Sequence, residues 1–193
     1  DQLMSRTRQR PMAAGRMNPR SGFAFGLVLG LVSLVVLGLG VNLLTMGLGA
    51  FALASYVLFY TPLKLRTPAA LFVGAIPGAM PPLMGWTAIT GEIGLGGITL
   101  FGVLLAWQMP HFIAISLFRK SDYLRAGIKV VPIVRGDRVA KLQALAWSTA
   151  LLPISLALTP LGVAGTLYFV VAAVLGLGFI GFCIYGLGRY EKK

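Results

Sequence analysis

Long apolar runs separated by short polar segments dominate the pattern of this 193-residue chain. Runs of about 18 or more apolar residues have the length that crosses a bilayer as a helix. They predict six membrane-spanning helices, at about residues 23–41, 48–60, 69–89, 98–117, 142–158 and 163–187. The second is long enough to span only if its helix begins near Leu43. The alternation of polar and apolar residues expected of a membrane β-barrel is not seen. The predicted fold class is therefore all-α, a polytopic membrane protein with a single domain over 1–193.

Composition and charge support this class and add a topology. The chain is 57% hydrophobic and 11% charged, whereas soluble domains carry about 25% charged residues. All 17 Lys and Arg residues lie in four segments, at about 1–21, 60–68, 119–141 and 188–193. By the positive-inside rule these segments are cytoplasmic loops and the lipid bilayer surrounds the rest. The net charge of +12 is therefore mainly a topology signal rather than a sign of nucleic-acid binding. The surplus in 119–141 also suits a polyanion such as diphosphate.

Proline interrupts two of the predicted spans. Pro77, Pro81 and Pro82 follow one another within six residues of the third span, and Pro110 lies inside the fourth. Proline removes a backbone donor, so we expect a kink or break at each place. Irregular backbone persists in a bilayer only where it packs against protein or lines a cavity. A kinked helix with close small-residue packing and a cavity wall are both compatible with this pattern.

The densest polar chemistry follows the fourth apolar run. His111 is the only histidine, and Asp122 stands close to Arg119 and Lys120. His111 suits either a hydrogen-bonded structural role or contact with a cofactor or substrate, including axial ligation of iron. Asp122 either forms a local salt bridge or binds Mg²⁺ while the cations hold diphosphate oxygens. Lys64, in the 60–68 loop, either anchors the membrane interface or reaches an anionic ligand.

Several motifs carry a family resemblance that covers nearly the whole chain. They are Asp1 with the basic stretch to Arg16, residues 60–68, residues 78–91, and the sequence 107–112 followed by Arg119, Asp122, Tyr123 and Pro132. Together they resemble the heme O synthases (protoheme IX farnesyltransferases), which are prenyltransferases of the UbiA superfamily. The pair Pro110–His111 ahead of a lone Asp-Tyr is the most specific match. Asp1 resembles the last carboxylate of an Asp-rich motif whose earlier part is missing.

The resemblance implies a UbiA-type helical bundle and a reaction. The family has about nine helices, so six here imply a truncated domain with helices missing at both ends. The implied reaction transfers a farnesyl group from farnesyl diphosphate to a vinyl group of heme B, with addition of water, and yields heme O. Mg²⁺ is the implied cofactor, with heme B as a substrate. The implied partners are farnesyl diphosphate, heme B and a heme A synthase or terminal oxidase assembly, in a bacterial inner membrane.

The resemblance also assigns roles to individual residues. The expected catalytic residues are Asp1, Asp122 and His111, of which Asp1 and Asp122 bind Mg²⁺ with the diphosphate and His111 faces the heme. The expected substrate contacts are Arg6, Arg10, Lys64, Arg119, Lys120, Tyr123 and Trp107. Cation–π contacts from Trp107, Phe112 or Tyr123 could shelter a carbocation.

Three rival functions remain open at this point. A UbiA-type prenyltransferase acting on a quinone or chlorophyll precursor would share most of these motifs. A membrane transporter would also contain broken helices, although the apolar runs here hold no carboxylate. A non-catalytic assembly factor would show no dependence on Asp122.

Overall fold

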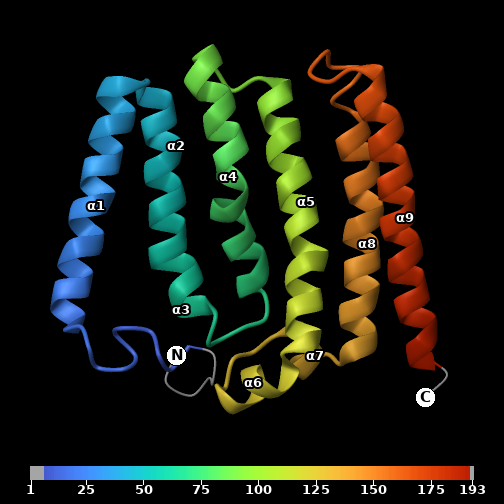
Figure 1. Ribbon diagram of the computed structural model, residues 1–193, viewed down its shortest axis with the longest axis horizontal. Helices are drawn as coiled ribbons and strands as arrows, with labels where there is room; N and C mark the ends of the chain where they lie inside the picture. The colour runs from blue at the N-terminus through green and yellow to red at the C-terminus, as the bar shows by residue number, and fades with distance from the viewer. Residues whose placement is uncertain (1–6, 192–193) are drawn as a thin grey trace.

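The structure is a computed structural model and describes residues 7–191. Within that range every regular element is a helix and there is no β-strand, as predicted. Its elements are α1 (Pro19–Gly40), α2 (Leu43–Ala54), η1 (Ser55–Tyr60), α3 (Thr61–Leu63), α4 (Ala70–Thr90), α5 (Leu95–Phe118), α6 (Lys120–Arg125), α7 (Val131–Val134), α8 (Asp137–Leu156) and α9 (Thr166–Glu191). The long helices stand side by side in chain order and alternate in direction (Figure 1).

The predicted membrane class is confirmed by the lengths and hydropathies of these helices. In the described part of the chain, five helical segments are long and apolar enough to cross a membrane: Pro19–Gly40, Leu43–Leu63, Leu95–Phe118, Asp137–Leu156 and Thr166–Gly188. The one remaining predicted span, the third at 69–89, corresponds to α4, which has 21 residues and stands among the others. Its prolines and glycines lower its mean hydropathy, and seven of its residues are buried among the neighbouring helices.

Asparagine side chains set the starts of the first two helices. The Asn18 side chain accepts a hydrogen bond from the Arg20 backbone N–H, and Pro19 occupies the first helical turn. The Asn42 side chain caps α2 in the same way, through the Thr45 N–H at 2.8 Å. Both are favourable N-cap arrangements. Because Asn42 starts the helix at Leu43, the second span gains the length that it needs.

Helix α4 remains helical through all three of its prolines, so the alternative of a broken helix is wrong. It packs between α2 and α5 and contributes several of the most buried side chains, including Ala75 and Ala79 at 0% exposure. Gly96 and Gly97 let α5 approach it closely, because a Cβ at either position would collide with the Trp86 ring. Helix α5 likewise continues through Pro110. Tight small-residue packing therefore supports the proline-containing backbone.

The second span contains a π-helical segment that the sequence pattern does not predict. Residues Ser55–Tyr60 form η1, and the helix then continues to Leu63. The predicted loop at 60–68 therefore begins about one turn too early. The wider π turn closes with the Thr61 backbone N–H bonded to the Tyr56 carbonyl oxygen, which also accepts from the Thr61 hydroxyl at 3.0 Å. Such segments occur frequently at functional sites.

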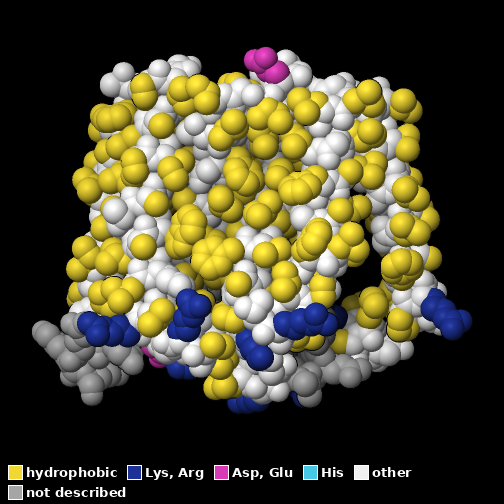
Figure 2. All heavy atoms as spheres, turned by 180° about the vertical axis from the view of Figure 1, so that it is seen from behind, with side chains coloured by type: hydrophobic (Ala, Val, Ile, Leu, Met, Phe, Trp, Pro, Cys, Tyr) yellow, Lys and Arg dark blue, Asp and Glu magenta, His cyan; other side chains and the backbone are white. Residues whose placement is uncertain are grey.

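The basic segments gather at one end of the helices. The turn before α1, the α3–α4 connection, the region from α6 to α7 and the end of α9 all lie at the lower edge of the bundle (Figure 1). Figure 2 shows the Lys and Arg side chains as a band along this edge, below a broad apolar surface. This arrangement is that of a multi-pass membrane protein with one strongly basic face.

Candidate substrate cavity and its basic mouth

A cavity of about 700 Å³ opens among α2, η1, α4, α5 and the segment from α6 to α7. It begins near the basic end of the helices and extends between them. Its lining is mainly apolar, with a few hydroxyl, amide and ammonium groups. This size and composition are typical of sites for small organic ligands. An amphipathic ligand with an anionic end and a hydrocarbon end suits such a cavity.

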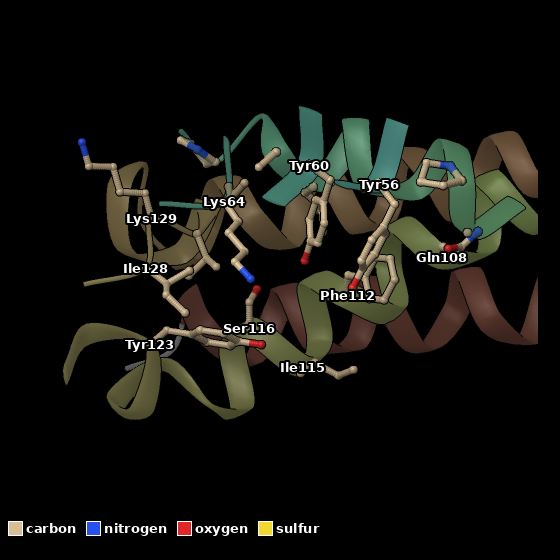
Figure 3. Close-up of a pocket in the computed structure, with 18 of the residues that line it drawn as sticks. Tyr56, Tyr60, Lys64, Gln108, Phe112, Ile115, Ser116, Tyr123, Ile128 and Lys129 are labelled. Carbon is tan, nitrogen blue, oxygen red and sulfur yellow. The ribbon is translucent and has the colours of Figure 1, made fainter. Parts of the chain in front are cut away.

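The mouth of the cavity combines a cation with hydroxyl groups. Lys64 follows α3 and is half-buried, and Figure 3 shows its ammonium pointing into the cavity toward the Ser116 hydroxyl. Tyr123 of α6 faces Lys64 from the opposite wall. The side chain of Lys129 also lines the cavity, but its ammonium points away from the centre. Lys64 is therefore the better placed of the two lysines to meet an anion inside.

Two tyrosines of the π segment form the next part of the wall. Tyr56 and Tyr60 have ring centroids 5.1 Å apart and a 38° angle between ring planes. Both point their hydroxyl groups into the cavity (Figure 3). Gly74 makes room for this arrangement, because a Cβ there would lie 2.5 Å from the Tyr60 ring. The π turn and this glycine together place two aromatic rings beside the mouth.

Gln108 and Phe112 occupy the α5 side farther from the mouth. Gln108 is only 6% exposed, and its Nε2 donates to the Leu104 carbonyl oxygen at 3.1 Å. Its amide oxygen approaches Gly78 of α4 so closely that a Cβ at that glycine would collide with it. Figure 3 shows Gln108 at the end opposite Lys64 and Lys129. A buried amide therefore marks the far end of the cavity.

The charged residues Arg119, Lys120 and Asp122 of the predicted diphosphate site do not line the cavity. Arg119 lies 3.9 Å from an Asp122 carboxylate oxygen and 5.0 Å from the centre of the Phe118 ring. Lys120 forms an ion pair of 2.6 Å with Asp137 across the loop. The Asp122 side chain is 14% exposed and directly precedes Tyr123, which does line the cavity. These charged side chains form local ion pairs of modest strength.

Trp107 and His111 lie away from this cavity. Their rings stack with centroids 4.9 Å apart and an interplanar angle of 13°. Trp107 lines a second apolar cavity of about 790 Å³ between α5, α8 and α9, where Ser155 and Tyr168 are joined by a 2.7 Å hydrogen bond. His111 is exposed. The structure thus separates these two predicted residues from Lys64 and Tyr123.

The remaining predicted residues lie before α1. Asp1 and Arg6 fall outside the described residues, and Arg10 is exposed in the turns that precede α1. Among residues 7–191, no three His, Cys, Asp or Glu side chains come together as a group that could hold a metal. A Mg²⁺ ion bound with a diphosphate needs only one or two carboxylates. Asp122, which directly precedes the cavity residue Tyr123, is a candidate for one of them.

Sequence reasoning did not identify several residues that line the cavity. Tyr56 and Tyr60 lie in the π segment, whose wider turn cannot be read from an apolar pattern. Gln108 and Ser116 are single polar residues inside an apolar run. Their positions eight residues apart on α5 could have indicated a shared helix face.

The fold and cavity define an α-helical membrane protein with a cavity at its basic end that is lined by both apolar and polar side chains. The sequence model of the UbiA prenyltransferase family matches residues 1–193, and the chain belongs to this family.

Curated relatives carry a more specific name. The chain is 51% identical over 189 residues to a protoheme IX farnesyltransferase of Myxococcus xanthus, covering 98% of this chain and 64% of the relative. It is 50% identical over 189 residues to a protoheme IX farnesyltransferase of Anaeromyxobacter dehalogenans, again covering 98% of this chain and 64% of the relative. A third, from Sorangium cellulosum, is 50% identical over 187 residues, covering 97% of this chain and 67% of the relative. The chain therefore spans about two thirds of the length of these relatives. No solved structure matches it.

Proposed function

We propose that the protein transfers a farnesyl group from farnesyl diphosphate to a vinyl group of heme B, with addition of water, to give heme O. The observation that carries this proposal is the cavity, which has the Lys64 ammonium at its mouth and an apolar interior. Its polarity matches that of a prenyl diphosphate. The near-complete coverage of this chain by relatives named protoheme IX farnesyltransferase supports the heme acceptor. It favours heme over a quinone or chlorophyll precursor, and family membership favours an enzyme over a transporter.

The residues at the mouth act first on the diphosphate. Lys64 pairs with its oxygens, and the Tyr123 hydroxyl group provides a hydrogen-bond donor nearby. The Ser116 hydroxyl donates to the Ile113 carbonyl oxygen at 2.8 Å and keeps only acceptor capacity toward the cavity. Arg119 and Lys120 contribute positive potential from the rim. Arg6 and Arg10 stay predicted contacts from the segment before α1. These groups stabilise the negative charge that develops on the diphosphate as the allylic C–O bond breaks.

The cavity then controls the fate of the farnesyl group. The bond electrons leave with the diphosphate, and a C–C bond forms to the vinyl group. Water adds to the resulting carbocation, and the released proton passes to the diphosphate. The rings of Tyr56, Tyr60 and Phe112 offer negatively polarised faces that stabilise positive charge on the allyl group. They also keep water away from it before the C–C bond forms.

A divalent metal ion is the general requirement of this family, and we propose Mg²⁺ as that ion. Asp122 would hold it together with Asp1 and the diphosphate oxygens. When bound, Mg²⁺ neutralises charge on the diphosphate leaving group. The contact of 3.9 Å between Arg119 and the Asp122 carboxylate is looser than the 2.6 Å ion pair between Lys120 and Asp137.

We place the acceptor on the side of Trp107 and His111. Their stacked rings present an aromatic surface next to an exposed imidazole. A planar porphyrin stacks on such rings, and imidazole suits iron. We further propose a bacterial inner membrane as the location, with the basic end in the cytoplasm. A heme A synthase or a terminal oxidase assembly would receive the product.

The direct test uses the full-length protein in membrane vesicles. With farnesyl diphosphate, Mg²⁺ and heme B, we expect a product with the mass of heme O. The same vesicles are given a quinone precursor in place of heme B as the competing acceptor. Product on the quinone precursor and none on heme B would refute the proposed function.

A further inference from the structure

We propose that Gln108, held against Gly78, ends the hydrocarbon part of the cavity and so sets the length of the prenyl chain that the enzyme accepts. This inference rests on the proposed function and adds a specificity-determining residue to it. The cavity has its charged end at Lys64, and its far end is at Gln108 (Figure 3). A prenyl diphosphate anchored at the charged end therefore extends toward Gln108.

Distance along α5 agrees with this role. Ser116, at the mouth, and Gln108 both line the cavity and are separated by eight residues. At a rise of 1.5 Å per residue, this places them about 12 Å apart along the helix axis. Such a separation corresponds to a prenyl chain of a few isoprene units. Phe112 lines the wall halfway between them.

The position of the Gln108 side chain is restricted on two sides. Its Nε2 donates to the Leu104 carbonyl oxygen at 3.1 Å, one turn back along its own helix. Its amide oxygen lies in the space that a Cβ of residue 78 would occupy, and a Cβ there would also be only 3.2 Å from the amide carbon. The glycine lets α4 and α5 close the far end with the amide between them. A side chain held in this way acts as a stop.

Shortening the stop would open the far end itself. The Gln108 amide fills the space between α5 and Gly78 of α4, and alanine in its place would leave that space empty. A longer chain therefore gains room if the Gln108 side chain is shortened. In the wild type, such a chain would also have to cover the buried amide with hydrocarbon, which disfavours it.

A competition assay with the full-length protein tests this stop. Vesicles receive heme B, Mg²⁺ and equal amounts of geranyl (C10), farnesyl (C15) and geranylgeranyl (C20) diphosphate, and the products are separated by mass. For Gln108→Ala we expect the C20:C15 product ratio to rise about tenfold over wild type, because pocket contacts discriminate one added hydrophobic group by about 10- to 200-fold. For Gly78→Ala we expect the C10:C15 ratio to rise, because the new methyl group and the displaced amide shorten the cavity.

Gly85→Ala is the matched control on the same helix. A Cβ at this position meets no atom within 4 Å, so both ratios should stay at the wild-type values. Wild type that forms no farnesylated heme would refute the proposed function itself. If the wild type forms farnesylated heme but Gln108→Ala leaves the C20:C15 product ratio unchanged, only the inference about chain length is overturned. If Gln108→Ala does not accumulate in membranes, an unchanged C10:C15 ratio in Gly78→Ala overturns it instead.

Discussion

Replacing Lys64 by Met should remove a large part of the diphosphate binding energy. The substitution keeps an unbranched side chain of similar length and deletes the ammonium that points into the cavity. One pair of unit charges 4 Å apart is worth about 4 kcal/mol at an effective dielectric constant of about 20. Lys64 is half-buried and must lose some water to bind, so roughly 2–3 kcal/mol should remain. We therefore expect kcat/KM for farnesyl diphosphate to fall by about 30- to 200-fold.

Lys129→Met is the control for this substitution. It removes the same charge from the same cavity wall, but the Lys129 ammonium points away from the centre. Its loss should lower kcat/KM less than about fivefold, through the weaker field at the mouth. The assay measures the initial rate of heme farnesylation in vesicles at constant ionic strength, with equal amounts of each variant. Equal losses in the two variants would show that net charge, rather than the placement of Lys64, controls diphosphate binding.

Three other substitutions test separate parts of the site. Asp122→Asn should lower turnover by at least about 100-fold while the protein still inserts into the membrane; activity that is retained at saturating Mg²⁺ would remove Asp122 from the metal site. His111→Ala should weaken heme binding and alter the absorption spectrum of bound heme, and an unchanged spectrum and affinity would leave it a packing role. Gly74→Ala should displace Tyr60 and reduce kcat by about tenfold or more, because small misplacements at a reacting centre are costly; full activity would show that the ring position is unimportant.

Family membership and the cavity account for different parts of the proposed reaction. The motif at residues 107–112 and 119–123 carries the resemblance to heme farnesyltransferases. Of its residues, only Gln108, Phe112 and Tyr123 line the main cavity, and none of these three is charged. Trp107 and His111 belong to a different face of α5. We infer that the two ends of this motif serve different substrates, the diphosphate donor at Tyr123 and the planar acceptor at Trp107 and His111.

The sequence by itself determined the helical membrane class and the basic ends of the helices, and it predicted two residues that line the cavity. Apolar length decides whether a segment can span a bilayer, and Lys and Arg distribution decides which ends are basic; both are local properties that tertiary packing does not change. The structure confirms the helical class. Lys64 and Tyr123 were both predicted substrate contacts, and the structure brings them to one cavity.

Only the tertiary structure decided which side chains share that cavity. The π turn at Ser55–Tyr60 changes the helical register, so hydropathy cannot show that both tyrosines face inward. The contact between Gly78 and Gln108 joins residues 30 positions apart, and it depends on how closely α4 and α5 approach. Trp107 and Gln108 are adjacent in the chain, yet they line different cavities because successive residues of a helix point about 100° apart. Side-chain direction is set by helix packing, and an apolar run contains no record of it.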